Sequence, residues 1–205
     1  MHRFFVRPEW LQNKEQVFLT GPLAHQLSRV LRLRPGAHII LLDDSGWAYE
    51  AELDSLSPSL GKAHVVAATQ PQTEPPVRLC LYQALLREQK FDWVLQKGTE
   101  LGVACFVPLV TERCVVSLSE ANEAKLARWQ RIVTEAAEQS GRVRLPRILS
   151  PRPLKACEQM PPGVLALIAC LGEGTIPLGQ ALRSTDVTAP HEIRLFIGPE
   201  GDFTP

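Results

Sequence analysis

Residues 193–205 read IRLFIGPEGDFTP. The apolar run Ile193–Ile197 is typical of a buried strand, and it leads directly into Gly198-Pro-Glu-Gly201, a turn with a glycine at each end. Glycine permits a positive φ and lets a ligand approach the backbone closely. Thr204-Pro205 then has the pattern of a helix start. A strand, a glycine loop and a helix start form the layout that binds ligands at the carboxyl edge of a parallel sheet.

Upstream of this loop, apolar runs and amphipathic segments alternate. Strands are predicted at 77–86, 105–110 and 164–169, and helices at 91–101, 122–140 and 178–184. The inner stripe of the helix 91–101 is expected to hold Phe91, Val94, Leu95, Gly98 and Leu101. Gly102 and Gly141 are placed to end the first two helices. This alternation predicts an α/β domain with a mainly parallel sheet and helices on both faces.

The first 70 residues have a different pattern, with short strand-like runs and one helix. Strands are predicted at 2–7, 37–42, 47–53 and 63–68, with a hairpin turn at 44–46. A helix is predicted from Pro22 to Leu33, capped by Thr20 and ended by Pro35-Gly36, with Leu23, Leu27, Val30 and Leu31 facing inward. We therefore expect a small β-barrel over 1–70, a Pro-rich linker over 71–76 and the α/β domain over 77–205.

The composition excludes several classes of protein. The chain has 205 residues, 45% of them apolar, and a net charge of zero. No apolar run is long enough to span a bilayer, and the N-terminus lacks a signal-peptide pattern. The five cysteines are scattered, without a CxxC pair or histidines at ligand spacing. We therefore expect reduced thiols, a cytoplasmic location and no metal site.

The charges are unevenly distributed along this neutral chain. Residues 1–40 carry six basic and two acidic side chains, and residues 41–60 carry five acidic and no basic ones. Residues 124–155 carry eight basic and two acidic side chains. Two basic segments suit local contacts with phosphates, although ordinary solvated faces have the same composition.

Six segments together resemble one enzyme family. They are HRFFVRP (2–8), HQLSRVLRLRPG (25–36), FDWVLQKGTELGV (91–103), VPLVTERCVV (107–116), KLARWQRIVTEAAEQSGR (125–142) and IGPEG (197–201). In this order they resemble the bacterial 16S ribosomal RNA (uracil-N3) methyltransferases of the SPOUT class. The chain departs from the family pattern at Asp202, where the family usually has glycine. The family also continues with a further strand, a Leu-Gly loop and a helix, so the resemblance implies that this chain is truncated at its C-terminus.

The resemblance carries several expectations about fold and function. It implies a PUA-like RNA-binding β-barrel followed by a SPOUT domain with a trefoil knot that is incomplete in this chain. It implies S-adenosylmethionine as cofactor, N3 of a uridine in 16S ribosomal RNA of the small subunit as target, and a homodimer. Two alternatives stay open: an RNA-binding module without activity, or a methyltransferase acting on a ribose 2′-hydroxyl or another base.

The resemblance places the cofactor against two loops. The first is Gly198, Pro199, Glu200 and Gly201, and the second is Cys170, Leu171 and Gly172 after the strand 164–169. Plain connecting turns are the alternative for both loops. Asp202 tolerates a left-handed backbone better than most residues, so the first turn is compatible with it. Cys170 is expected to be a small buried thiol rather than a nucleophile.

Eight arginines are candidates for RNA phosphate contact. They are Arg3, Arg7, Arg29, Arg32, Arg34, Arg113, Arg142 and Arg144. His25, Arg29 and Arg32 are expected on one face of the first helix. Solvated faces and, for Arg142 and Arg144, the dipole at a helix C-terminus are the alternatives.

The catalytic base is not identified by the sequence. Glu200 lies in the first loop, but a carboxylate that caps backbone N–H groups fits the same position. An arginine that stabilises an N3-deprotonated uracil is a further alternative.

Overall fold

A computed structural model of the protein describes residues 1–87, 89–114, 123–157, 159–185, 187 and 189–204. They form two compact units, of which unit 1 comprises Met1–Glu74 and Ala137–Leu145, and unit 2 comprises Pro75–Ala136 and Pro146–Pro205. The boundary at Glu74 falls inside the linker predicted at 71–76. The segment 137–145 clusters with unit 1, although the sequence assigned it to the second domain. One reason is that Val143 packs against the buried side chains of Leu42 and Ala48.

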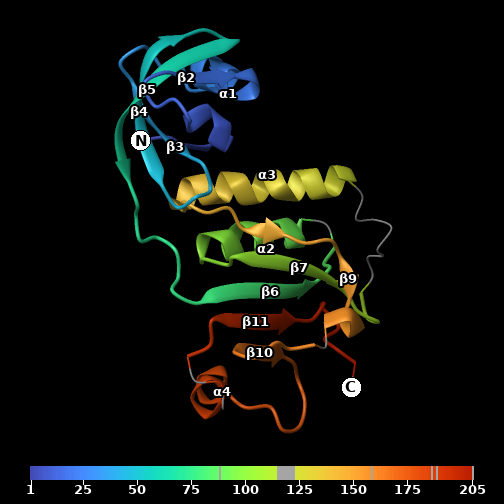
Figure 1. Ribbon diagram of the computed structural model, residues 1–205. Helices are drawn as coiled ribbons and strands as arrows, with labels where there is room; N and C mark the ends of the chain where they lie inside the picture. The colour runs from blue at the N-terminus through green and yellow to red at the C-terminus, as the bar shows by residue number, and fades with distance from the viewer. Residues whose placement is uncertain (88, 115–122, 158, 186, 188, 205) are drawn as a thin grey trace. The chain divides into compact units, whose positions relative to one another are not determined.

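Unit 1 is built on one five-stranded sheet (Figure 1). Its elements are β1 (Arg3–Phe5), η1 (Pro8–Leu11), β2 (Val17–Thr20), α1 (Gly21–His25), η2 (Gln26–Val30), β3 (His38–Leu42), β4 (Ala48–Leu56) and β5 (Leu60–Thr69). The strand order is β1-β3-β4-β5-β2, in which β1 and β3 are parallel and the other pairs antiparallel. The sequence missed β2, and closure of the sheet into a barrel stays a prediction.

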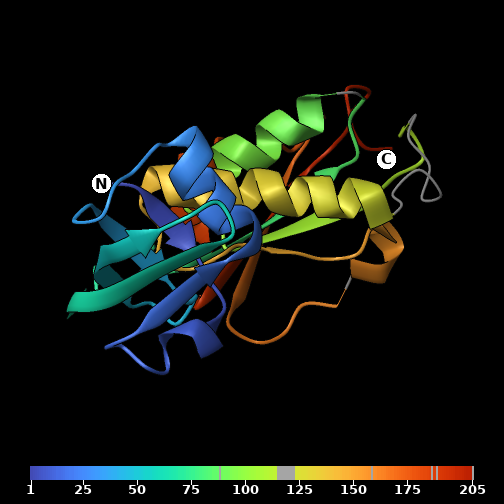
Figure 2. The same ribbon diagram turned by 90° about the horizontal axis from the view of Figure 1, so that it is seen from above.

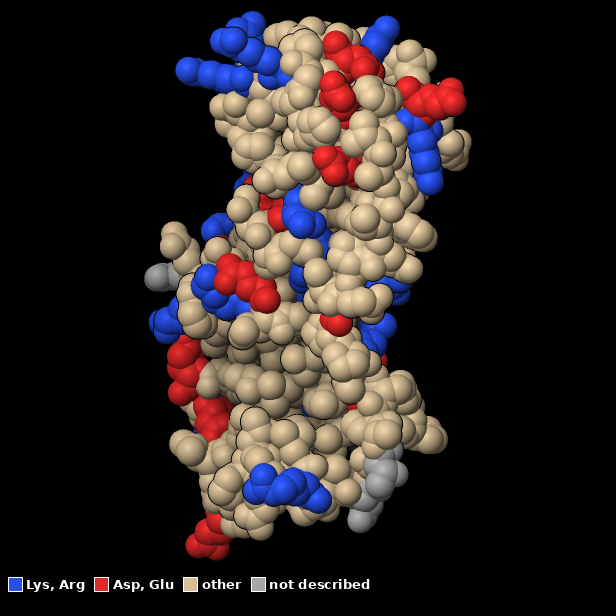
Figure 3. All heavy atoms as spheres, turned by 90° about the vertical axis from the view of Figure 1, so that its left-hand side faces the viewer, with Lys and Arg blue, Asp and Glu red and all other residues tan. Residues whose placement is uncertain are grey.

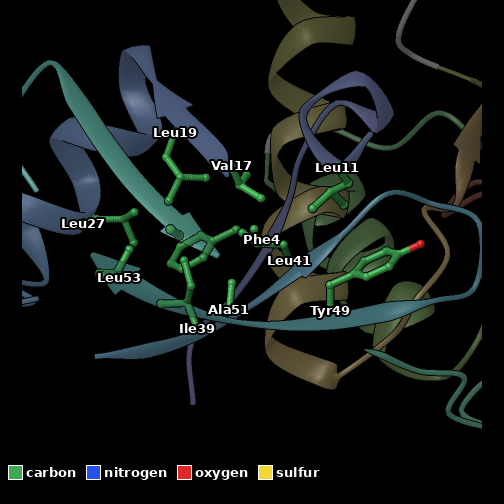
Figure 4. Close-up of a cluster of buried hydrophobic side chains, with 11 residues drawn as sticks. Phe4, Leu11, Val17, Leu19, Leu27, Ile39, Leu41, Tyr49, Ala51 and Leu53 are labelled. Carbon is green, nitrogen blue, oxygen red and sulfur yellow. The ribbon is translucent and has the colours of Figure 1, made fainter. Parts of the chain in front are cut away.

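The core of unit 1 takes alternate side chains of β4 (Figure 4). Tyr49, Ala51 and Leu53 are all buried, and they pack with buried side chains of β1, β2 and β3. The predicted hairpin between β3 and β4 is confirmed. Asp44 and Gly46 take the left-handed backbone that its tight turn requires, with φ of 63° and 96°.

The helix predicted at Pro22–Leu33 is shorter and wider than expected. An α-helical turn, α1, passes into a π-helical turn, η2, in which the Leu31 N–H donates to the Gln26 carbonyl at 2.9 Å. Arg32 has a φ of 52° and ends the helix before Pro35. Because a π turn holds more residues than an α turn, it rotates the side chains that follow. Val30 is therefore 67% exposed rather than inward. Arg32 lies beyond the helical turns, so it does not continue the helix face predicted for it with His25 and Arg29.

Unit 2 contains a six-stranded sheet in which every pairing is parallel, as predicted (Figure 1). Its elements are β6 (Arg78–Ala84), α2 (Lys90–Glu100), β7 (Cys105–Val110), α3 (Glu123–Ser140, whose last residues cluster with unit 1), β8 (Arg147–Ile148), β9 (Arg152–Pro153), η4 (Leu154–Cys157), β10 (Val164–Ala169), α4 (Leu178–Ser184) and β11 (Glu192–Ile197). The order is β10-β11-β6-β7-β8, with β9 also paired to β7. The last strand thus lies inside the sheet, between β10 and β6.

The two faces of this sheet are covered differently. α2 and α3 lie side by side, with the rings of Phe91 and Trp129 4.6 Å apart, and pack on one face (Figures 1 and 2). On the described part of the other face, Leu154 of η4 and the loop residues Leu149 and Phe203 cover the buried side chains. The prediction of helices on both faces is therefore wrong in detail, because a short 3-10 turn and loops cover the second face.

The helix α2 also corrects one predicted core position. Phe91, Leu95 and Gly98 are buried as expected, but Leu101 is 80% exposed. Gly98 allows close packing, since a Cβ there would lie 2.7 Å from a ring carbon of Phe106. Gly102 has a φ of 94° and follows the helix end, so it acts as the predicted stop.

Candidate functional site

Three strands of unit 2 end in the same register. Ala169 of β10 pairs with Ile197 of β11, which pairs with Gln83 of β6. Because the strands are parallel, the loops that follow them emerge at one edge of the sheet. β10 and β11 are neighbours, so the two predicted cofactor loops are adjacent.

The loop 198–201 is held by side chains from several elements. The Gln83 amide Nε2 donates to the Gly198 carbonyl at 3.3 Å, and Arg113 Nη1 donates to the Gly201 carbonyl at 2.7 Å. Lys90, at the start of α2, forms an ion pair with Glu200 at 2.7 Å. Residues from β6, α2 and the segment after β7 therefore fix the position of this loop.

The glycines of this loop do not adopt the positive φ that the sequence suggested for them. Gly198 and Gly201 are outside the left-handed region, and Asp202 is in it with a φ of 63°. Gly198 is needed for close approach instead, because a Cβ there would lie 3.2 Å from the backbone carbonyl carbon of Asp202. The turn is closed by the Asp202 N–H, which donates to the Pro199 carbonyl at 3.0 Å. The predicted tolerance of Asp202 for this conformation is confirmed.

The second loop is joined to the first through Asp202. The Leu171 N–H donates to Asp202 Oδ2 at 2.8 Å, and the Phe203 N–H donates to Oδ1 at 2.8 Å. The Leu171 side chain is 90% exposed, and Cys170 is exposed too, contrary to the expectation of a buried thiol. Among the described residues other than its two chain neighbours, none has a heavy atom within 4 Å of where a Cβ of Gly172 would stand, so its backbone is open to a ligand.

The two loops line a groove at the sheet edge. It has a volume of about 420 Å³ and is lined by Ala169, Cys170, Leu171, Ile197, Gly198, Pro199, Glu200 and Asp202. A mostly apolar pocket of about 570 Å³ shares Ala169, Cys170 and Ile197 with it and extends toward Leu178 of α4. Both volumes are in the range of small-molecule sites, roughly 300–1,000 Å³.

Both acidic side chains of the groove are stabilised in their charged form. The hydrogen bond from Lys90 is the largest cause that lowers the pKa of Glu200 below its ordinary value. Backbone N–H groups of Leu171 and then Phe203 lower the pKa of Asp202. At neutral pH both carboxylates are therefore ionised and act as acceptors rather than acids.

Among the described residues, no group of three or more His, Cys, Asp or Glu side chains is placed to hold a metal ion. No helix within the described ranges combines the length and the apolar character needed to cross a membrane. All five cysteines have free thiols.

Comparison with known proteins identifies the family. Residues 73–205 match the RNA methyltransferase domain. The chain belongs to the RNA methyltransferase family. It is 37% identical over 205 residues to ribosomal RNA small subunit methyltransferase E of Synechocystis sp., with 99% of this chain and 65% of that protein covered. The protein of the same name from Bacillus subtilis is 29% identical, with 100% of this chain and 82% of that protein covered.

A solved structure supports the mixed α/β fold of this chain. The crystal structure of ribosomal RNA small subunit methyltransferase E from Neisseria gonorrhoeae, bound to S-adenosyl methionine, is 35% identical and superposes with a TM-score of 0.85. The match covers 100% of this chain and 82% of that one. The present chain thus spans about two thirds of the length of its Synechocystis relative and 82% of this structural relative.

The eight candidate arginines of this chain divide between the two units. Arg113 lies at the groove, where it binds the Gly201 carbonyl. Seven belong to unit 1, of which Arg7, Arg29, Arg32, Arg34 and Arg144 are exposed and Arg3 is half-buried. On the face drawn in Figure 3, basic and acidic side chains are interspersed rather than gathered by sign. RNA contact by the exposed arginines stays a prediction.

The surroundings of Arg142 argue against its predicted role as a contact for RNA phosphate. Its side chain is 5% exposed and pairs with Glu74, with Nη2 2.6 Å from Oε2 and Nε 3.1 Å from the same oxygen. The Glu74 carboxylate also accepts the Val143 and Arg144 N–H groups, each at 3.2 Å. A buried, paired guanidinium is structural, so Arg142 is not an open phosphate ligand. Arg144 is exposed, but its guanidinium donates to the carbonyls of Asp44 and Ser45.

Sequence reasoning missed two side chains that support the groove, Gln83 and Lys90, and it did not foresee the bond between Asp202 and Leu171. Gln83 was detectable, because it is a buried polar residue in the apolar strand β6 and donates to Gly198. Lys90 binds Glu200, which is 110 residues away, and Asp202 binds the Leu171 N–H, which is 31 residues away. No local pattern reveals such contacts, since they depend on which strands become neighbours.

Proposed function

We propose that this chain carries the S-adenosylmethionine site of an enzyme that methylates N3 of a uridine in 16S ribosomal RNA. The observation that supports it most is the groove between the loops 170–172 and 198–201, at the carboxyl edge of the sheet. A relative with this fold was solved with S-adenosyl methionine bound. Relatives named as small subunit ribosomal RNA methyltransferases support the RNA substrate.

The groove suits the cofactor in shape and chemistry. Backbone groups of Gly198 to Gly201 and of Cys170 to Gly172 would hold it, with the open backbone of Gly172 allowing close approach. When bound, the cofactor supplies an electrophilic methyl group. Because methyl transfer is a displacement, the main task of the protein is to align the methyl carbon with the acceptor nitrogen.

The proton on uracil N3 must leave during the reaction. Glu200 is paired with Lys90 and its pKa is lowered by that hydrogen bond, which makes its carboxylate a weaker base. Arg113 is exposed at the same loop and is the better candidate for a charge that stabilises a deprotonated uracil. Solvent then takes the proton in this proposal.

The same proposal includes the types of the two domains and the oligomeric state. Unit 1 would be the PUA-like RNA-binding barrel and unit 2 a SPOUT domain whose trefoil knot is incomplete in this chain, working as a cytoplasmic homodimer. Exposed apolar side chains of unit 2 support a partner surface, among them Leu171, Ile168 and Leu178, which are 90%, 53% and 58% exposed. Light scattering of the purified chain tests the dimer.

Two measurements test the enzyme. Isothermal titration with S-adenosylmethionine should give saturable binding, and primer extension on treated 16S ribosomal RNA should stop at one uridine. N3 methylation blocks the Watson–Crick edge, whereas ribose methylation with full read-through would favour a 2′-hydroxyl target. RNA binding without cofactor binding would favour a non-catalytic RNA-binding module.

The RNA surface of unit 1 is tested by Arg29→Ala with Arg32→Ala. Both side chains are exposed, and loss of two phosphate contacts should reduce the slope of log affinity against log salt by about two units. Lys97→Ala is the control, because Lys97 is paired with Glu100 on α2. An unchanged slope would leave these arginines merely solvated.

A further inference from the structure

We propose that Asp202 is a positioning residue that sets the width of the cofactor groove by tying its two walls together. The inference rests on the proposed function, because that function makes the groove a cofactor site. It concerns a residue at which the chain departs from the family pattern. Its basis is the geometry of one carboxylate and two backbone N–H groups.

Each oxygen of the Asp202 carboxylate binds a different segment. Oδ2 accepts the Leu171 N–H, and Oδ1 accepts the Phe203 N–H, both at 2.8 Å. Charge-assisted bonds of this length are the stronger kind of hydrogen bond. One side chain therefore connects the end of the loop 198–201 with the loop after β10.

The backbone of Asp202 makes this connection possible. Its φ of 63° lies in the left-handed region, which aspartate, asparagine and glycine tolerate best. Asparagine retains a side-chain oxygen that can accept the Leu171 N–H, whereas glycine retains only the conformation. Substitution by these two residues therefore separates the acceptor from the backbone geometry.

The loop 170–174 has few other anchors among the described residues. The register between β10 and β11 ends at Ala169 and Ile197, and the side chains from 168 to 180 are all exposed. Thr175 donates to the Gly172 carbonyl, but this bond lies within the loop. Within the described part of the chain, the hydrogen bond from the Leu171 N–H to Asp202 Oδ2 therefore joins this loop to the opposite wall of the groove.

The two walls share the ligand, so their separation matters for binding. Leu171 lines one side of the groove, and Gly198 and Glu200 line the other. A wall that is already ordered costs less to bind against than one that must be ordered by the ligand. Asp202 should therefore act on cofactor affinity and not on the rate of methyl transfer once the cofactor is bound.

The test compares wild type, Asp202→Asn and Asp202→Gly. With S-adenosylmethionine as titrant, we expect Asp202→Gly to raise the dissociation constant roughly tenfold and Asp202→Asn by less than about threefold. The Michaelis constant for the cofactor should follow the same order, with kcat nearly unchanged. Hydrogen exchange of the Leu171 amide, measured without cofactor, should be faster in Asp202→Gly only. Glu100→Gln, in an exposed pair on α2, is the control for loss of a surface charge.

The outcomes are distinguishable. If wild type binds cofactor and Asp202→Gly binds equally well, the positioning role is overturned. If Asp202→Asn is as weak as Asp202→Gly while its Leu171 amide stays protected, charge and not position is responsible, and the inference fails. A wild-type chain that does not bind S-adenosylmethionine overturns the proposed function, whereas unchanged Leu171 exchange in Asp202→Gly overturns the loop connection by itself.

Discussion

Glu74 in unit 1 and Asp202 in unit 2 are carboxylates that perform similar chemistry in different surroundings. Glu74 accepts the Val143 and Arg144 N–H groups from 69 and 70 residues away, and Asp202 accepts that of Leu171 from 31 residues away. Glu74 also pairs with the buried Arg142, whereas Asp202 borders an open groove. The hydrogen bonds of Glu74 therefore have a mainly structural role in unit 1. The hydrogen bonds of Asp202 in unit 2 lie next to a groove that a ligand can occupy.

The largest expected effect is on the half-buried carboxylate of Glu74, which pairs with the buried guanidinium of Arg142. Glu74→Ala should reduce the stability of unit 1 by about 3–5 kcal/mol, because it leaves the guanidinium of Arg142 buried without this partner. Hydrogen exchange of residues 38–69 under mild denaturant measures the change. Glu74→Gln should cost less, since its amide oxygen still accepts the two backbone N–H groups. A loss no greater than that of the exposed-pair control Glu100→Gln would contradict a structural role.

Substitution of the groove carboxylate Asp202 should give the opposite division of effects between stability and ligand binding. Asp202→Gly should leave the unfolding midpoint of unit 2 within error of wild type, because Asp202 lies at the surface of the groove. Its effect should fall on cofactor affinity, as proposed above. Urea unfolding followed by the fluorescence of Trp129, which is buried in unit 2, checks this expectation. A clear fall in the midpoint would make Asp202 structural, like Glu74.

Acid titration should separate Asp202 from its neighbours. Backbone N–H bonds lower its pKa below the ordinary value of 3.8. Since the folded-state pKa is lowered, the contribution of the ionised form is fully present above 3.8 and is lost as the pH falls through the lower value. The chemical shift of the Leu171 amide should therefore be constant from pH 7 to about 4 and change only below it. Asp202→Asn should abolish this step, and a midpoint above 4 would contradict the bond.

The smallest effect concerns the openness of the groove. Cys170 is exposed at its rim, Cys114 is half-buried, and Cys80, Cys105 and Cys157 are buried. A disulfide reagent should therefore modify one thiol quickly in the native chain, and Cys170→Ser should remove that phase with little loss of stability. Fast modification of two or more thiols in Cys170→Ser would show that the cores are less closed than described.

The predictable part of the fold came from patterns that act locally. The apolar runs of β7, β10 and β11 and the amphipathic stripes of α2 and α3 predicted their elements within two residues in the described ranges. The helix start at Asn122 and the residues Val115, Val116 and Pro205 lie outside the described residues. The first helix was less predictable, because the π-helical turn η2 and the left-handed Arg32 break the period on which the prediction depends.

The candidate site was predictable only in its loops. The glycines of 198–201 and of 172–174 are visible in sequence because glycine has a distinctive backbone, and the resemblance assigned them a ligand. Their contacts with Gln83, Lys90 and Arg113 were not visible, since these side chains become neighbours of the loop only after β6, β7 and β11 pair. Gln83 stands out in sequence only as a polar residue in an apolar strand, and Arg113 only as a candidate for RNA contact. The same limit explains Arg142, whose charge suggested an exposed phosphate ligand until its burial against Glu74 was seen.

The sequence by itself determined the two folding patterns, the parallel sheet of unit 2, the position of the glycine loop and the family. These properties depend on hydrophobic period and backbone freedom, which each segment carries alone. Tertiary structure decided that β11 lies between β10 and β6, that residues 137–145 complete unit 1, and that Asp202 joins two loops. Such features depend on burial and on contacts between distant residues, so the identical carboxylate chemistry of Glu74 and Asp202 acquires its role only in the folded chain.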